Sequence, residues 1–172
     1  MTALNLEADL EREHPHCFAW AVTCCRADRT EAEDVLHLAY LKVLDGRARF
    51  DGRSSFRTWL FGVIRLTAQE QRRRRWIQLR WLDRQSAAGP EAPDPAPDPA
   101  EQTVSADNQW RLGMALARLS RRQQEMMHLV FYQGLSIQEA GMVLGIPVGT
   151  ARTHYERGKL RLRRLLAEME GQ

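Results

Sequence analysis

Four side chains near the C-terminal end of the chain are of types that can recognise the edges of DNA bases, namely Arg152, Thr153, His154 and Arg157. In a major groove, arginine donates two hydrogen bonds to guanine, and threonine bonds to several bases. Such contacts need a helix that presents these side chains to solvent while its opposite face is buried. The elements that the surrounding sequence builds therefore decide whether this chemistry is possible.

Residues 136–166 predict two helices joined by a tight turn. Ser136 and Glu139 have the spacing of a capping box, which begins a helix. Gly145 tolerates the left-handed conformation that ends one, and Pro147 suits the first position of the next. The stripe expected to be buried in the second helix consists of Val148, Ala151, Tyr155, Gly158, Leu162 and Leu165. This pattern is typical of a helix-turn-helix that reads DNA. A plain helical hairpin with a solvated basic face is the alternative.

Positive charge is concentrated in two blocks of the 172-residue chain. Residues 1–85 hold 15 Lys and Arg against 12 Asp and Glu, and residues 108–172 hold 10 against five. Residues 86–107 hold five acids, no Lys or Arg, and five of the seven prolines. Basic blocks favour a nucleic-acid partner, and an acidic Pro-rich stretch predicts an extended linker. We therefore expect an all-α protein of two small helical domains, 1–85 and 108–172, joined by a linker at 86–107.

The N-terminal residues lack the pattern of a signal peptide, and no apolar run is long enough to span a bilayer, so we expect a cytoplasmic protein. Three cysteines make an odd number, which argues against a disulfide framework. With His14 and His16 nearby they invite a metal or redox hypothesis. The spacing of Cys17, Cys24 and Cys25 fits no closed zinc pattern, however. We expect neither a metal nor another cofactor, and no catalytic site.

Three helices are expected in the first block. Residues 10–28 predict the first, which begins after Pro15. The face expected to be shared in it consists of Phe18, Ala21, Val22 and Cys25. Thr30 and Glu33 form a capping box that predicts the start of the second, EAEDVLHLAYLKVL, which ends at Asp45–Gly46.

A loop and a long helix follow. The loop spans residues 46–55, and the ring of Phe50 in its middle either packs back on the protein or meets a base. The helix is marked by Phe56, Trp59, Leu60, Val63 and either Leu66 or Thr67. It runs into four consecutive arginines, Arg72–Arg75. Such a run is usually solvated, but beside Trp76 it also fits phosphate contact with stacking.

Four helices are expected in the last block. The first begins at Gln109, with one face of Trp110, Met114 and Ala117 and another of Leu112, Leu116 and Leu119. Ser120 and Gln123 form a third capping box, and Gly134 ends the helix that it opens. The residues expected to point inward from this helix are Met126, Val130 and Phe131. With the helix-turn-helix these make a small DNA-binding unit.

Taken in order, these segments resemble the extracytoplasmic-function class of bacterial RNA polymerase sigma factors, in the sigma-70 family. EAEDVLHLAYLKV is similar to the family's helix that binds core polymerase, and SFRTWLFGVIRLTA to its helix for the −10 promoter element. Residues 119–166 are similar to its −35 reading domain. The resemblance covers about residues 10 to 167.

The resemblance implies a promoter-specificity subunit that binds core RNA polymerase at its β′ coiled coil and β flap and helps to open the −10 duplex. The contacts implied with core polymerase come from Asp34, Val35, Leu38, Leu41 and Lys42. Those implied with the −10 element come from Phe50, Ser54, Ser55, Arg65, Gln69, Arg72 and Arg73. Those implied with the −35 element come from Thr150, Arg152, Thr153, His154, Arg157 and Lys159.

The resemblance also implies an anti-sigma factor that covers the two domains. Two other functions fit parts of the chain. A stand-alone helix-turn-helix regulator does not need the Asp34 helix and the arginine-rich helix together, whereas a sigma factor needs both. An enzyme or metal sensor built on the His and Cys residues would need convergent polar groups in a pocket.

Overall fold

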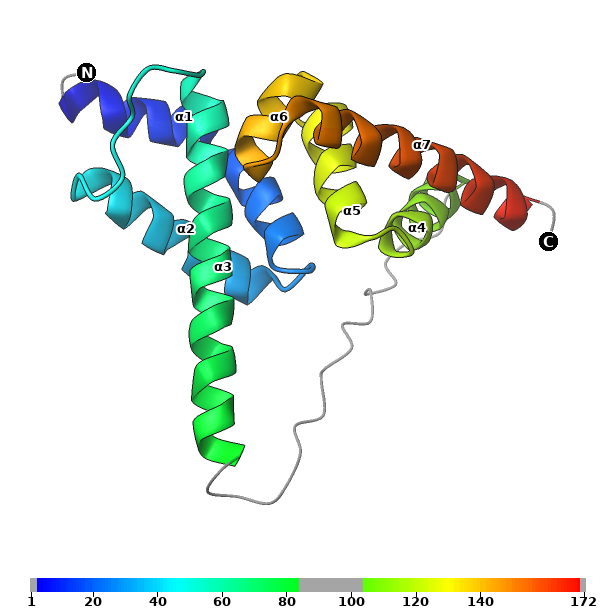
Figure 1. The fold of residues 1–172 in the computed structure, drawn as a ribbon, viewed down its shortest axis with the longest axis horizontal. Coiled ribbons are helices and arrows are strands. Elements are labelled where there is room, and N and C mark those ends of the chain that lie inside the picture. Colours follow the sequence, from blue (N-terminus) through cyan, green and yellow to red (C-terminus); the bar gives the residue numbers. More distant parts are fainter. Residues whose placement is uncertain (1–2, 84–103, 171–172) are drawn as a thin grey trace. The chain divides into compact units, whose positions relative to one another are not determined.

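The computed structural model describes residues 3–83 and 104–170 and divides the chain into two compact units, residues 1–96 and 97–172. Every regular element within the described residues is a helix (Figure 1), which confirms the all-α prediction. Most of the predicted linker lies outside them. Its last four residues were wrongly predicted, because α4 already begins at Val104. No proline follows Pro99, and Asp107 suits a first helical turn.

The N-terminal unit consists of α1 (Ala3–Cys24), α2 (Arg29–Leu44) and α3 (Phe56–Asp83), each packed on the other two. The prediction that the first helix begins after Pro15 was wrong, because α1 runs through this proline. An interior proline costs about 3 kcal/mol. Leu10 and Cys17, which are buried on either side of Pro15, account for the continuation, since the helix must persist to bury both.

The buried face of α1 differs from the predicted one. Its fully buried residues are Cys17, Trp20, Ala21 and Cys24, whereas Phe18 and Val22 are only half-buried. The Trp20 indole donates a hydrogen bond of 3.0 Å to the Phe61 carbonyl of α3. Phe18 instead lies beneath the guanidinium of Arg29, 5.2 Å from its ring centre. Because α1 packs on two helices at once, it buries a broader face than a single stripe.

The start of α2 was also predicted wrongly. Its N-cap is Asp28, whose carboxylate accepts a hydrogen bond of 2.9 Å from the Glu31 N–H, and Thr30 lies inside the helix. Arg26 and Ala27 adopt φ values of 56° and 68°, which reverse the chain immediately after α1. This short reversal leaves Asp28 as the first residue that can cap α2. The helix ends at Asp45, as predicted.

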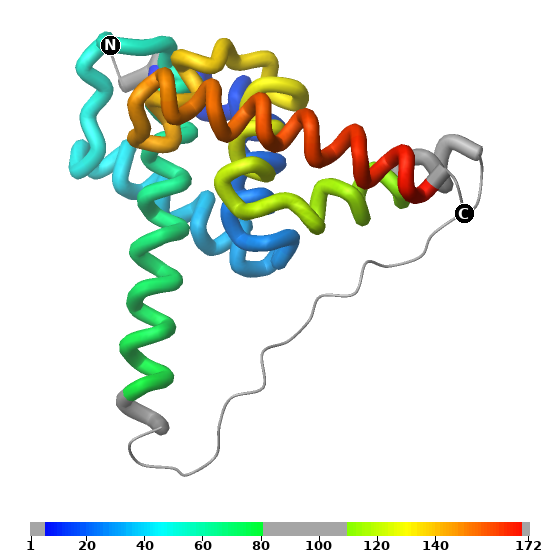
Figure 2. The backbone as a smooth tube through the Cα atoms, turned by 45° about the vertical axis from the view of Figure 1, so that its right-hand side comes forward, coloured from blue at the N-terminus to red at the C-terminus, as the bar shows by residue number. Residues whose placement is uncertain are grey.

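The loop 45–55 rises from the end of α2 to the start of α3 (Figure 2). Phe50 packs back on the protein, with its ring centre 5.7 Å from that of Phe56 and 5.4 Å from that of Trp59. The Ser55 hydroxyl accepts a hydrogen bond of 3.1 Å from the Thr58 N–H and so caps α3. The first half of α3 lies against α1 and α2, and its last turns extend beyond both (Figures 1 and 2).

The C-terminal unit consists of α4 (Val104–Ala117), α5 (Arg121–Met127), the π-helical turn η1 (His128–Tyr132), α6 (Ile137–Leu144) and α7 (Val148–Glu170). Its buried core joins α4, α5 and α7 through Ala115, Leu119, Met127 and Leu165. Ser120 and Gln123 form the predicted capping box.

The prediction that Phe131 points inward was wrong, because its side chain is 61% exposed. The π turn widens the helix at this point, which changes the direction of the residues that follow from that of a regular 3.6-residue repeat. Met126 is buried, as predicted. On α4, the core is formed by Ala115 rather than by Trp110 or Met114, which are 55% and 40% exposed.

Candidate functional site

The turn between α6 and α7 has the predicted geometry. Ser136 and Glu139 form the capping box, with Glu139 Oε2 accepting from the Ser136 N–H at 2.9 Å and Ser136 Oγ accepting from the Glu139 N–H at 3.2 Å. The hydrogen bonds from the Ser136 side chain and backbone lower the pKa of Glu139. Gly145 ends α6 with φ at 62°, and the Pro147 carbonyl accepts the first hydrogen bond of α7, from the Ala151 N–H.

Gly141 is a part of this turn that periodicity alone missed. A Cβ at this position would lie 3.2 Å from the Ile146 carbonyl oxygen and 3.3 Å from the Ala151 Cβ. The absence of a side chain therefore lets α7 approach α6 closely. A glycine in the middle of an otherwise apolar helix was the available signal.

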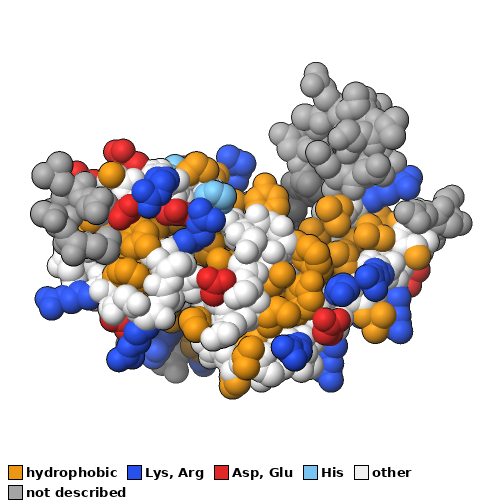
Figure 3. All heavy atoms as spheres, turned by 90° about the horizontal axis from the view of Figure 1, so that it is seen from above, with side chains coloured by type: hydrophobic (Ala, Val, Ile, Leu, Met, Phe, Trp, Pro, Cys, Tyr) orange, Lys and Arg blue, Asp and Glu red, His pale blue; other side chains and the backbone are white. Residues whose placement is uncertain are grey.

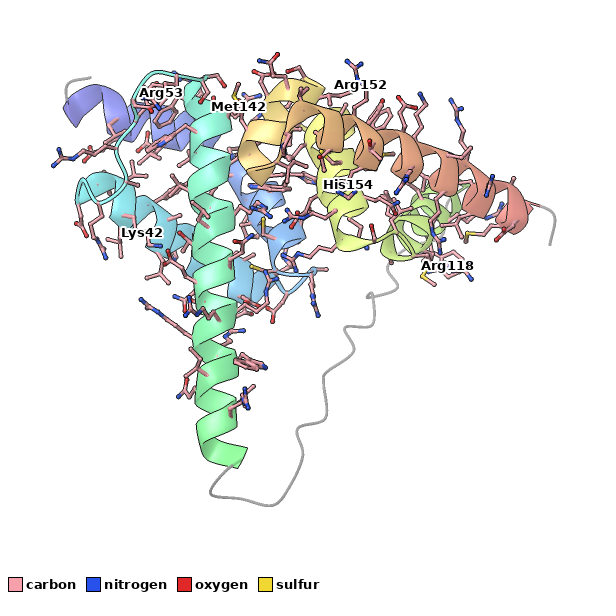
Figure 4. All side chains as sticks on the ribbon, in the orientation of Figure 1. Lys42, Arg53, Arg118, Met142, Arg152 and His154 are labelled. Carbon is pink, nitrogen blue, oxygen red and sulfur yellow. The ribbon has the colours of Figure 1, made fainter. Side chains whose placement is uncertain are left out.

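The outer face of α7 carries most of the residues predicted to read DNA. Thr150, Arg152, Thr153 and Arg157 are exposed and His154 is half-buried. Figure 4 shows Arg152 projecting from the outer side of the helix. The Thr153 hydroxyl donates to the Gly149 carbonyl at 2.9 Å, which leaves its oxygen able to accept from a ligand. These side chains form a surface suited to the edges of bases.

The opposite face of α7 is buried, with one correction. Ala151, Gly158 and Leu165 are buried as predicted, but Val148 is 53% exposed because it stands in the first turn. Lys159 lies 5.6 Å from the Tyr155 ring centre and 3.9 Å from Glu156 Oε2. Its ammonium group therefore has contacts within the protein, unlike the arginines on the outer face.

The residues predicted to dock on polymerase do not all lie on the surface of α2. Asp34 and Leu41 are exposed and Leu38 is half-buried, whereas Val35 has no exposed surface, so it was wrongly included among the contact residues. A shallow cavity of about 300 Å³ lies between α2 and α3 and is lined by residues that include Asp34, His37, Leu38, Gln71 and Arg75.

Lys42 connects the two helices that border this cavity. Its ammonium group donates to Glu70 Oε2 at 2.7 Å and to Thr67 Oγ1 at 3.0 Å, both on α3 (Figure 4). A residue predicted to contact a partner thus has a role in packing α2 on α3.

The residues predicted to contact the −10 element are similarly divided. Phe50 packs on aromatic rings and Ser55 caps α3, while Gln69 and Arg73 are exposed. Arg65 is only 6% exposed, so its prediction as a DNA contact was wrong.

Two intramolecular bonds explain where the arginines of this set lie. When the Gln69 amide is oriented with its oxygen toward the guanidinium, it accepts from both terminal nitrogens of Arg65, at 2.9 and 3.0 Å. Arg72 donates to the Cys24 carbonyl at 3.2 Å. Arg65 therefore orients Gln69, and Arg72 binds the C-terminal end of α1, where carbonyl groups lack helical partners.

The cysteines lie in the core. Cys17, Cys24 and Cys25 are buried free thiols, and burial raises the pKa of Cys17 to about 12 against a smaller lowering by its hydrogen bond with Tyr40. Across residues 3–83 and 104–170, no three His, Cys, Asp or Glu side chains come together as a metal site. None of the described helices has the length and apolar character needed to cross a membrane.

Comparisons with known proteins identify both units. Residues 10–77 match the family model of sigma-70 region 2, and residues 109–162 match that of sigma-70 region 4. The extracytoplasmic-function (ECF) RNA polymerase sigma factor SigX of Bacillus subtilis is 31% identical over 138 residues, which cover 80% of this chain and 71% of that protein. This chain belongs to the ECF class of the sigma-70 family. The sigma factor CarQ of Myxococcus xanthus is 30% identical over 139 residues, covering 81% of this sigma factor and 76% of CarQ.

Solved structures share the fold of this sigma factor. The sigma factor RpoE of Bartonella quintana, in complex with the anti-sigma factor NepR, gives a TM-score of 0.71 at 24% identity, covering 95% of this chain and 97% of that chain. CnrH, in complex with the cytosolic domain of CnrY, gives a TM-score of 0.63 at 19% identity, covering 95% and 88%. At these identities the likeness concerns the fold, and it agrees with the family assignment.

Proposed function

We propose that this sigma factor binds core RNA polymerase through α2 and directs it to promoters through α3 and α7. The observation that carries the proposal is the presence of regions 2 and 4 in one chain, each with its exposed polar surface. A stand-alone regulator has no need of region 2. Sigma factors are not in general enzymes, and we propose that this one acts in the cytoplasm by binding alone.

The outer face of α7 is proposed to read the −35 element. Arg152 and Arg157 are exposed there and can donate two hydrogen bonds each to guanine, with Thr150, Thr153 and His154 beside them. Lys159 is assigned a backbone contact at most, because its ammonium group already has contacts with Tyr155 and Glu156.

The polymerase contact is proposed to centre on Asp34, with Leu38 and Leu41 as its apolar part. Asp34 stands beside the cavity between α2 and α3, and Leu41 is 49% exposed. An acid flanked by exposed leucines suits a basic amphipathic partner, since the charge orients the encounter and the apolar area supplies affinity. Lys42 contributes by holding α3 against α2.

The −10 contact is proposed to involve Ser54, Gln69 and Arg73, with Phe50 shaping the loop. Gln69 is exposed on α3 and oriented by Arg65, and Arg73 follows it one helical turn later. An amide can form two hydrogen bonds with adenine, and an arginine can neutralise a phosphate.

An anti-sigma factor is proposed as a further partner. The relatives RpoE and CnrH were solved in complexes, with NepR and with the cytosolic domain of CnrY. Leu41 and Leu44 of α2 are each 49% exposed, so a protein that covers them would also cover the proposed polymerase contact.

Co-elution with purified bacterial core RNA polymerase on size exclusion tests the function. We expect the wild-type chain to co-elute and Asp34→Arg to be lost from the complex. Glu11→Arg is the matched control, because it reverses an exposed acid on α1, and it should co-elute normally. Absence of wild-type co-elution would favour the stand-alone regulator, and loss of both variants would show that α2 is not the specific contact.

A further inference from the structure

The last turns of α3 expose large apolar side chains among arginines. Trp76, Ile77 and Leu79 are 57%, 40% and 47% exposed. Residues 72–80, RRRRWIQLR, contain five arginines and no acid. In both ribbon views this part of α3 extends beyond α1 and α2 (Figures 1 and 2). The match to region 2 ends at residue 77, whereas the helix continues to Asp83.

The four consecutive arginines are not equivalent. Arg72 donates to the Cys24 carbonyl at 3.2 Å, and Arg75 Nη1 lies 3.2 Å from Glu31 Oε2 of α2. Both are thus turned toward the body of the unit. Arg73 and Arg74 are exposed, and neither has an ion pair among the residues that the structure describes.

One outward stripe combines charge with an aromatic ring. Arg73, Trp76 and Arg80 follow one another at steps of three and four residues, which places them on the same face of the helix. The Arg80 guanidinium lies over the Trp76 ring, 4.6 Å from its centre. This contact covers one side of the indole and holds the cation beside it.

We propose that the stripe of Arg73, Trp76 and Arg80 is a DNA-binding surface that extends the promoter contact of α3 beyond region 2. The inference rests on the proposed function. Arg73 and Arg80 are separated by about 10 Å along the helix, at 1.5 Å per residue, which is comparable with about three nucleotides of one strand. The two guanidinium groups bind phosphates, and Trp76 packs its open side on a base or sugar between them. The absence of acids from 72–80 is what selects DNA over a protein partner.

Salt-dependent binding of the full-length chain tests this surface. The probes are a fluorescently labelled 30-base-pair duplex of mixed sequence and one of its single strands. We expect Arg73→Ala and Arg80→Ala each to reduce the slope of log affinity against log salt by about one, since each removes one phosphate contact. Trp76→Ala should weaken binding about fivefold or more, and Trp76→Phe should retain most of it. A larger loss on the single strand than on the duplex would mean that Trp76 stacks on a base, and an equal loss that it packs on the sugar.

Two matched controls separate this surface from general loss of charge. Arg12→Ala removes an exposed arginine of α1, and Arg75→Ala removes the neighbour that bonds to Glu31. Both should leave the slope unchanged. The proposal is overturned if Arg80→Ala behaves like Arg12→Ala, or if Trp76→Ala binds DNA as the wild type does, in which case the exposed ring serves a protein partner.

Co-elution with core polymerase is measured on the same preparations. If the wild type fails to co-elute, the proposed function fails whatever the DNA result. If co-elution is normal and the slopes of the Arg73 and Arg80 variants do not change, only the extended DNA surface is wrong.

Discussion

Gly158 of α7 lies directly against Gln123 of α5, so that a Cβ at position 158 would stand 3.3 Å from the Gln123 Cβ and 3.5 Å from the Met127 Cγ. The helix that carries the candidate DNA-reading residues is therefore seated on α5 through a position that has no side chain. The cost of a glycine within a helix, roughly 1 kcal/mol relative to alanine, is offset by this close packing.

Gly158→Leu should destabilise the chain by about 1–3 kcal/mol, because the larger side chain forces α7 away from α5. Thermal unfolding followed by circular dichroism measures the change. Gly113→Ala is the control, since Gly113 lies in α4 and a Cβ there would meet nothing within 4 Å. That variant should gain up to about 1 kcal/mol. Equal stability of Gly158→Leu and wild type would mean that the two helices are not closely packed.

Removal of the Glu13 carboxylate should destabilise the N-terminal unit. Glu13 is 7% exposed, and its Oε2 lies 2.5 Å from Arg57 Nε of α3. Glu13→Ala leaves a half-buried guanidinium without its counter-charge, which should cost about 2 kcal/mol in urea unfolding. Arg47→Ala breaks an exposed pair with Asp45 and should change stability by less than about 0.5 kcal/mol. Similar losses in both variants would contradict a special role for the buried pair.

His128 should make stability depend on pH. Burial lowers the pKa of His128 from 6.5 to about 4. Between these values the unfolded chain binds a proton that the folded chain does not, so the contribution is complete above pH 6.5 and is lost as the pH falls toward 4. We expect urea midpoints of the wild type to fall over this range, and those of His128→Gln to fall less. Parallel curves for the two proteins would show that other groups cause the change.

Arg157→Ala should weaken binding to the −35 element by about 1–3 kcal/mol and alter the preferred sequence, if Arg157 reads a base. Selection of sites from a random DNA library by the full-length chain measures both effects. Arg164→Ala removes another exposed arginine of α7 and should weaken binding without a change in preference. A uniform loss across all sequences for Arg157→Ala would reduce its role to a phosphate contact.

The helix-turn-helix was predictable because its signals are local. Ser136, Glu139 and Gly145 act within one or two turns of their own chain, so their roles follow from residue type and spacing. The same holds for the overall division into two helical units. The resemblance to the family could be read from whole segments for the same reason, since their order survives even where single residues differ.

Features that depend on tertiary packing were not predictable in this way. Thr30 and Asp28 are both good caps, and the reversal after α1 decided between them. Glu125 has a polar side chain but is 1% exposed, because Arg121 and Arg122 bond to it at 3.0 and 3.3 Å. Helical periodicity cannot indicate such a buried carboxylate.

The candidate site was divided in the same manner. The exposed residues on α7 were predicted from one helix alone. Arg65 and Val35 were predicted from similar segments and proved to be buried, because their burial depends on neighbouring helices that a pattern does not contain.

The placement of the cysteines makes this sigma factor its own probe of partial unfolding. All three lie in or just after α1, and the C-terminal unit has none. Alkylation requires an accessible thiolate, so a folded N-terminal unit is protected by burial, and at Cys17 by a pKa raised to about 12 as well. The rate of thiol labelling therefore reports opening of the polymerase-binding unit alone, and a partner that clamps that unit will slow the labelling without a fluorescent tag or an engineered residue.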